Sequence, residues 1–199
     1  MLKAVIFDLG EVYVNGFKDV ELLLEPVLGI SSDKIHSIIH SNDLMLLFRG
    51  KISEDEYLSK TIQRGGWKID LRDFKRIIRN NFKEVEGTEK IIKELNAKGL
   101  KIGLLSDHSK EWIDYIKENF NHHKMFHHTL YSFEVGLIKV EGKGFEIMVK
   151  KLEVLPEECL FIDDNPNNLI PARKLGMKVI QFNNSNQLKK ELVSLGIID

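Results

Sequence analysis

Acidic side chains follow two apolar runs that have the composition of buried strands. Asp8 comes directly after residues 4–7, and Asp163 and Asp164 come directly after residues 159–162. A carboxylate at such a position can attack an electrophile, carry a proton or bind a hard divalent cation. The carboxyl ends of parallel strands meet at one edge of a sheet, which is where ligands bind. We therefore expect these three carboxylates to lie together.

Two further strand ends carry polar side chains. Ser106 and Asp107 follow a predicted strand at 100–105, and Lys139 lies in the loop after a short predicted strand at 129–132. Each feature alone has a structural explanation. A serine at a strand end is usually structural, a loop lysine is usually solvated, and an acidic pair before Asn-Pro can cap a helix. Only their common placement at one sheet edge favours a functional site.

The elements that must position these residues alternate regularly from Gly87 onward. The periodicity predicts helices at 88–98, 110–120, 142–152 and 166–175, strands at 100–105, 129–132, 158–162 and 178–182, and a terminal helix. Such alternation predicts an α/β fold, namely a Rossmann-like parallel sheet flanked by helices on both faces.

Residues 17–82 show helical periodicity without a convincing strand. Gly29 and the pair Gly65-Gly66 end helical stretches, and the acidic residues after Ser53 suit the first turn of another. We interpret this block as an insertion over the sheet edge. The predicted organisation is a discontinuous core domain of residues 1–14 and 85–199, with an all-helical cap domain of residues 15–84.

Composition narrows the classes of partner. The chain has 199 residues and a formal net charge of −1, so it lacks the basic surface that nucleic-acid binding needs. The sequence has no run of about 18 apolar residues, so we expect no membrane span. The sequence enters a strand directly after Met1 and shows no signal or transit peptide, so we expect a cytoplasmic protein. The single cysteine, Cys159, is expected in the core. Composition leaves the oligomeric state open.

Taken in order, four segments resemble the motifs of the haloacid dehalogenase superfamily, most of whose members are phosphatases. These segments are Phe7-Asp8-Leu9-Gly10, Gly103-Leu104-Leu105-Ser106, Val135-Gly136-Leu137-Ile138-Lys139 and Phe161-Ile162-Asp163-Asp164-Asn165. The usual continuation is matched by Asn168, Ala172, Gly176, Met177 and Val179. The resemblance covers nearly the whole chain and identifies the helical block with the cap of that superfamily.

The resemblance implies a hydrolase of a small phosphomonoester, such as a sugar phosphate, that acts through an aspartyl-phosphate at Asp8. It implies that Ser106 and Lys139 are catalytic with Asp8, and that Ser106, Asp107 and Lys139 bind the substrate. A Mg²⁺ cofactor would cancel the repulsion between the Asp8 carboxylate and the phosphate. Its implied ligands are Asp8, the Gly10 carbonyl, Asp164 and, directly or through water, Asp163.

The first motif departs from the superfamily at Gly10, where most of its phosphatases have a second aspartate that acts as general acid and base. Glycine offers no proton, and Glu11 is the nearest acidic replacement. A branch resembling bacterial glucose-1-phosphate phosphatases also carries Asp-Leu-Gly here, so hydrolysis is expected to persist but to be slow. Asp107 also replaces a frequent asparagine and brings negative charge near the phosphate. Val140 replaces a usual proline, which predicts a less rigid lysine loop.

Two other functions stay open. Haloacid dehalogenases also use an aspartate nucleophile, lack the second aspartate and need no metal. The acidic pair Asp163-Asp164 argues against this alternative because it concentrates charge suited to Mg²⁺. A catalytically weak relative that serves as a binding or regulatory protein is the second alternative, and Gly10 is the feature that favours it.

Two groups of residues outside the motifs could have a function. Cap residues that could line the site or pack the core of the cap are Leu46, Leu47, Phe48 and Trp67. Histidines that could bind zinc, but that we expect in a surface loop, are His122, His123, His127 and His128.

Overall fold

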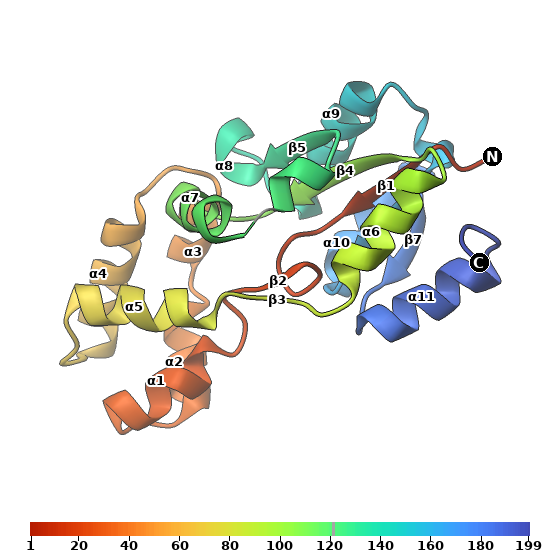
Figure 1. Cartoon of the computed structure of the whole chain (residues 1–199). Helices are drawn as coiled ribbons and strands as arrows, with labels where there is room; N and C mark the ends of the chain where they lie inside the picture. The colour runs from red at the N-terminus through yellow and green to blue at the C-terminus, as the bar shows by residue number, and fades with distance from the viewer. Residues whose placement is uncertain (121) are drawn as a thin grey trace.

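A five-stranded parallel sheet forms the centre of the molecule (Figure 1). The computed structural model describes residues 1–120 and 122–199. The strand order is β5-β4-β1-β6-β7. The strands are β1 (Ala4–Phe7), β4 (Lys101–Ser106), β5 (His128–Tyr131), β6 (Cys159–Asp163) and β7 (Lys178–Gln181). The predicted parallel α/β sheet is thus confirmed, with the first strand at its centre.

Helices cover both faces of this sheet because its strands are apolar on both sides. Val5 and Phe7 belong to a buried cluster that includes residues of α6 (Thr88–Ala97), α7 (Lys110–Asn119) and α11 (Ser185–Ser194). Ala4 and Ile6 point to the other face and pack with α9 (Lys143–Leu152) and α10 (Pro166–Lys174). Each predicted helix of this region is present within about two residues of its expected ends.

Five helices lie between the first and second strands of the sheet and gather beside one end of it (Figure 1). They are α1 (Val20–Leu28), α2 (Ser32–Ile39), α3 (Asn42–Phe48), α4 (Glu54–Gly65) and α5 (Leu71–Asn81). β2 (Val14–Asn15) precedes these helices in the chain and β3 (Lys83–Glu84) follows them, and the two strands pair as an antiparallel ribbon. Residues 16–82, which lie between the two strands, are called the helical segment below. The domain boundaries at 14/15 and 84/85 stay a prediction.

Short elements between α7 and β6 were not predicted from the sequence. These are a one-turn helix α8 (Ser132–Val135) and the 3₁₀ turns η1 (His122–Met125), η2 (Lys139–Glu141) and η3 (Pro156–Glu158). They are too short to show a hydrophobic period. Cys159 is fully buried as expected. Among the described residues, no helix has both the length and the apolar character that crossing a bilayer requires.

A buried carboxylate joins the helical segment to the core. Glu54, at the start of α4, is 1% exposed. It accepts hydrogen bonds from both terminal nitrogens of Arg79 in α5, at 2.6 and 2.7 Å, and from the indole nitrogen of Trp112 in α7, at 2.6 Å. A buried charge is tolerated only when it is paired in this way. This network therefore fixes α4 and α5 against α7.

We expect Glu54→Ala to destabilise the protein by about 3 to 5 kcal/mol, because it leaves Arg79 largely buried and without its carboxylate. Glu56→Ala is the matched control. Glu56 lies in the same first turn of α4 but forms an exposed pair with Lys60, and such pairs contribute only about 0.2 to 1 kcal/mol. Urea unfolding of both variants measures the difference. Equal stability losses would contradict a structural role for the Glu54 network.

Candidate active site

Asp8 lines a cavity at the carboxyl edge of the sheet. Phe7, the last residue of β1, is paired with Leu104 of β4 and Ile162 of β6, which run two residues and one residue further at the same edge. The Asp8 backbone N–H donates to the Ile162 carbonyl at 2.9 Å, which fixes the start of the loop. The cavity is lined by Asp8, Gly10, Glu11, Phe17, Lys18, Met45, Phe48, Asp107, His108, Ile138, Lys139, Val140, Asp164, Asn165 and Asn168.

Lys139 is buried between two of the predicted carboxylates. Its Nζ lies 2.5 Å from Asp8 Oδ2 and 2.6 Å from Asp163 Oδ2, and the residue is only 2% exposed. Burial by itself lowers the pKa of Lys139, but the carboxylates of Asp163, Asp8 and Asp107 outweigh it and raise that pKa above its ordinary value. Lys139 is therefore a permanent positive charge against the Asp8 carboxylate.

Asp107 holds the turn that carries Lys139. Both of its carboxylate oxygens accept from the Lys139 backbone N–H, at 3.1 Å each. The same turn is closed by Glu141, whose carboxylate accepts from the Ile138 N–H at 2.8 Å and from Arg49 at 2.8 Å. The turn is thus anchored although Val140 stands where proline is usual. The negative charge of Asp107, expected near a phosphate, therefore lies against the backbone N–H of Lys139.

Two predicted site residues lie behind the cavity wall. Ser106 is fully buried at the end of β4, and its Oγ lies 3.2 Å from His108 Nδ1. Asp163 is also fully buried. Its carboxylate accepts from Lys139, from the Asn165 backbone N–H at 2.8 Å and from the Asn168 amide at 3.1 Å. Both residues therefore support the side chains that reach the cavity.

The donor set at this edge fits a hard divalent cation. Carboxylate oxygens of Asp8, Asp163 and Asp164 all lie within 4.8 Å of one another. Burial raises the pKa of Asp8, an effect that Lys139 opposes, and burial also raises the pKa of Asp164, to which the Asp163 charge adds. A cation would relieve this accumulation of negative charge. Each Asp163 oxygen already accepts two hydrogen bonds. Each Asp8 oxygen has only one partner among the described residues, the Leu9 N–H or Lys139, so Asp8 and Asp164 are the side chains with capacity left for a direct metal bond.

Glu11 reaches the cavity through an unusual backbone conformation. Its φ is +59°, in the left-handed region that residues other than glycine rarely adopt. The side chain turns back so that Oε1 accepts from the Gly16 N–H at 2.8 Å. Burial raises the pKa of this carboxyl group. Although a neighbour of Gly10 is expected to point elsewhere, Glu11 therefore faces the same cavity.

His108 is a cavity residue that the sequence analysis missed. A Cβ atom added at Gly10 would lie 3.3 Å from His108 Cε1, so the imidazole occupies the space beside the residue that replaces the second aspartate. His108 Nδ1 lies 2.7 Å from the Asp107 carbonyl oxygen. A carbonyl only accepts, so Nδ1 carries the proton and Nε2 keeps a lone pair. Nε2 is buried and has no hydrogen-bond partner among the described residues.

The environment of His108 keeps it neutral. Burial lowers the pKa of its imidazole to about 4, and Lys139 contributes to the shift. A Cβ atom added at Gly16 would lie 3.7 Å from Glu11 Oε1 and 3.8 Å from His108 Nε2, so both groups border one small space. The only sequence signal was a histidine two places after Ser106, and a lone histidine carries little information.

The helical segment supplies an apolar wall. Phe17, Met45 and Phe48 line the cavity, and the Phe48 ring lies parallel to the His108 imidazole with centroids 6.1 Å apart. Of the four cap residues considered from sequence, only Phe48 lines the cavity. Leu47 is buried in the core, Leu46 is exposed, and Trp67 packs against Phe74 with ring centroids 5.9 Å apart.

The histidines near residue 125 are not gathered around a common point in the described structure. Candidate metal groups among the described residues include none of His122, His123, His127 and His128. The expectation of a surface loop is wrong for His122, which is fully buried against Tyr13 and Tyr131. His127 accepts a hydrogen bond from the Ile102 N–H at 3.0 Å.

Sequence comparisons find relatives of which this chain spans different shares. The chain is 28% identical over 149 residues to flavin mononucleotide hydrolase 1 of Arabidopsis thaliana, covering 75% of this chain and 60% of that protein. It is 24% identical over 205 residues to the D-ribitol-5-phosphate phosphatase of Bacteroides thetaiotaomicron, covering 96% and 97% of the two chains. This chain thus spans less than two thirds of the plant enzyme but nearly all of the bacterial one.

Solved structures share the fold. A HAD family enzyme of Bacteroides thetaiotaomicron in complex with magnesium and inorganic phosphate superposes with a TM-score of 0.75 at 19% identity, covering 92% of this chain and 96% of that chain. L-2-haloacid dehalogenase of Xanthobacter autotrophicus superposes with a TM-score of 0.68 at 20% identity, covering 100% and 85%. A family model described as haloacid dehalogenase-like hydrolase matches residues 2–176. The chain therefore belongs to the haloacid dehalogenase-like hydrolase family.

Proposed function

We propose that this protein is a Mg²⁺-dependent hydrolase of a small phosphomonoester that forms an aspartyl-phosphate at Asp8. One observation carries the proposal: the Asp8 carboxylate lies in the cavity between the Lys139 ammonium, 2.5 Å away, and the carboxylate of Asp164, within 4.8 Å. A nucleophile flanked by a fixed cation and a second carboxylate suits attack on an anionic phosphate. The named phosphatase among its relatives supports this proposal.

In the first step, an Asp8 oxygen attacks phosphorus, and the bond between phosphorus and the ester oxygen breaks. Lys139 stabilises the negative charge that gathers on the transferring group. The leaving oxygen needs a proton. Glu11 borders the cavity, and because burial raises its pKa it is the group suited to donate that proton. Glu11 thus acts as the general acid that Gly10, without a side chain, cannot supply.

In the second step, water attacks phosphorus and the bond to the Asp8 oxygen breaks, which releases inorganic phosphate and restores the carboxylate. The Nε2 atom of His108, which has no hydrogen-bond partner among residues 1–120 and 122–199, is the base suited to accept the proton of that water. A neutral imidazole with a free lone pair can accept a proton but cannot donate one from Nε2. The proton on His108 would then pass to the Glu11 carboxylate, which borders the same small space, so that both groups return to their starting states.

Asp8, Asp164 and the Gly10 carbonyl would hold Mg²⁺, with Asp163 contributing through water. When bound, the ion neutralises charge between nucleophile and phosphate and orients the phosphate. Asp164 suits this role because, in the part of the chain that the structure describes, its one ion-pair partner is Lys18, 3.7 Å away. Asp163 instead keeps Lys139 in position.

The substrate contacts that distinguish one phosphomonoester from another would come from the helical segment. Phe17, Met45 and Phe48 form an apolar wall opposite the polar edge of the sheet, and Lys18 adds one positive charge. A compact sugar phosphate or similar metabolite fits this mixture of polar and apolar surface. A panel of sugar phosphates, nucleotides and small phosphorylated acids would identify the substrate.

Metal-independent dehalogenation is the second candidate, and the shared fold with a haloacid dehalogenase favours it. The acidic pair at the end of β6 argues against it because dehalogenation needs no cation. Turnover of 2-chloropropionate in EDTA would support this candidate. Absence of turnover for every phosphomonoester at high protein concentration would instead support a non-catalytic binding or regulatory role.

We expect Asp8→Asn to abolish turnover of the best phosphomonoester in the panel, because the amide is not a nucleophile for phosphorus. The variant should also fail to trap a phosphate mimic such as beryllium fluoride. Asp114→Asn, at an exposed position of α7 paired with Lys110, should retain full activity. Full activity of Asp8→Asn would refute the proposed nucleophile.

We expect His108→Gln to lower kcat by about 10²- to 10⁴-fold and to accumulate the aspartyl-phosphate, because the second step loses its base. Glu11→Gln should slow the first step and accumulate no intermediate. Rapid quench followed by mass spectrometry of the phosphorylated chain distinguishes the two. The reverse pattern would exchange the two roles, and normal kinetics of both variants would exclude them.

We expect EDTA to stop phosphomonoester turnover and added Mg²⁺ to restore it. Mg²⁺ should also raise the melting temperature of the wild type, because a ligand that binds only the native state stabilises it. Asp164→Asn should lose most of that increase. Asp163→Asn should instead lower the melting temperature without any metal, because Lys139 loses a buried partner. An undiminished Mg²⁺ effect in Asp164→Asn would contradict the assigned ligand.

A further inference from the structure

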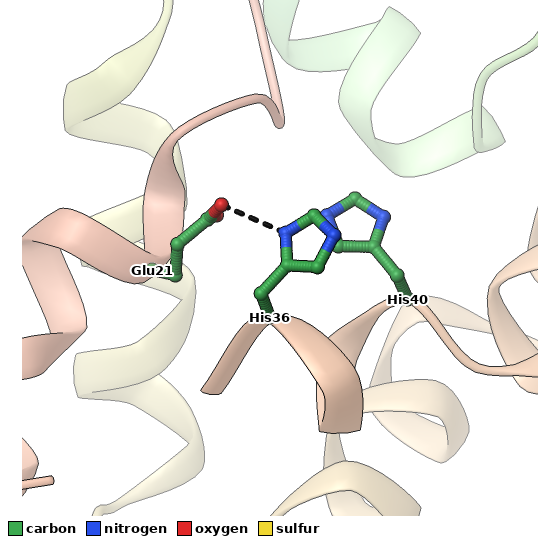
Figure 2. Close-up of side chains that lie close together, drawn as sticks. All are labelled: Glu21, His36 and His40. Atoms are coloured by element: carbon green, nitrogen blue, oxygen red, sulfur yellow. Dashed lines mark hydrogen bonds and ion pairs between the residues drawn. The ribbon is translucent and has the colours of Figure 1, made fainter. Parts of the chain in front are cut away.

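A second group of ligating side chains lies in the helical segment, outside the candidate active site. Glu21 belongs to the first turn of α1, His36 to α2, and His40 is the residue that ends α2. The two histidines are four residues apart and therefore share one face of the helix. Figure 2 shows the Glu21 carboxylate facing His36, with the His40 ring beside it.

The three side chains are close enough to share one ion. A ring nitrogen of each histidine and a carboxylate oxygen of Glu21 all lie within 4.8 Å of one another. Glu21 Oε1 is 2.9 Å from His36 Nδ1, and the two imidazole centroids are 4.0 Å apart. Ligands of one tetrahedral zinc ion stand about 3.3 Å apart, given bond lengths of ~2.0–2.1 Å. Small side-chain rotations would close the remaining gap.

The charge of Glu21 is poorly compensated. The residue is only 9% exposed, yet its Oε2 has no hydrogen-bond partner in the described part of the chain. Its one ion-pair partner there is His36, which is charged only when protonated. A buried carboxylate oxygen without a partner is costly. A cation bound between Glu21 and the two imidazoles would remove that cost.

Solvent reaches the two imidazoles, each of which can supply a ring nitrogen to a metal. Both rings are exposed to solvent on one side, so an ion can reach them.

We propose that Glu21, His36 and His40 bind one Zn²⁺ ion that links α1 to α2. Two imidazoles and one carboxylate form a nitrogen-rich set that suits Zn²⁺, whereas the all-oxygen set around Asp8 suits Mg²⁺. Three protein ligands leave the fourth position to water. The proposal is independent of the reaction proposed above.

The ion would lie behind one wall of the active-site cavity. The His40 ring packs edge-on against Phe17, with centroids 5.7 Å apart, and Phe17 stacks on Trp112 at 4.7 Å. Phe17 also lines the cavity. A bound ion would therefore restrain the helical segment next to the place where the substrate enters.

The test uses the whole protein, freed of metal with a chelator and titrated with Zn²⁺ in a calorimeter and with Co²⁺ in an absorption spectrometer. We expect one Zn²⁺ per chain, a raised melting temperature and visible Co²⁺ bands of a nitrogen-ligated site. His36→Gln, His40→Gln and Glu21→Gln should each weaken Zn²⁺ binding at least tenfold, since even the loss of outer-shell partners costs about 10- to 100-fold. Circular dichroism verifies that each variant is folded.

Two controls separate this site from the others. The double variant His123→Gln/His127→Gln removes another pair of histidines four residues apart and should bind Zn²⁺ as the wild type does. Asp164→Asn should lose the Mg²⁺ effect and keep the Zn²⁺ site, so failure of either proposal is seen separately. Undiminished Zn²⁺ binding in the Glu21, His36 and His40 variants, or its loss in the His123/His127 control, would overturn the proposal.

Discussion

The ion cluster around Lys139 is the interaction on which the rest of the structure depends. A buried ammonium and its carboxylates each lose roughly several kcal/mol of hydration, which is recovered only when the geometry is good and the remaining donors and acceptors are satisfied. Here Asp8, Asp163, Asn168 and the backbone of Asn165 complete the cluster. The ends of β1 and β6 and the turn at Lys139 must therefore meet in one arrangement. The same arrangement would prepare Asp8 for the proposed role of nucleophile.

The helical segment is tied to this arrangement through Trp112. Its indole donates to Glu54 of α4, and its ring stacks on Phe17 of the cavity wall. The Phe48 ring reaches from α3 to the same place and covers His108. The wall that would select a substrate is thus packed directly against the core that would bind the phosphate. In the proposed function, phosphate chemistry and substrate choice would come from separate parts of the chain that share one aromatic contact surface.

Two titratable residues border the space that a side chain at Gly10 would occupy. His108 lies beside that position, and Glu11 adopts a left-handed backbone that brings its carboxylate to the same space. Acid and base functions that one aspartate would combine can be divided between two residues. The superfamily motif alone suggested a weakened site, whereas the packing around Gly10 shows two titratable groups in its place.

The sequence by itself determined the parallel sheet, its flanking helices and the residues at the strand ends. The hydrophobic period and the polar residues that follow each strand are local signals, because each is contained in a short stretch of sequence. Asp8, Lys139 and Asp164 reach the cavity as those signals predicted. The tertiary structure alone decided that Asp107 anchors a backbone turn and that Ser106 and Asp163 lie behind the cavity wall. It also decided that His108 lines the cavity. It also brought Glu21 to His36, 15 residues further along the chain, and to His40 beside it. Such roles depend on rotamers, burial and contacts between separate elements, which no single stretch of sequence encodes.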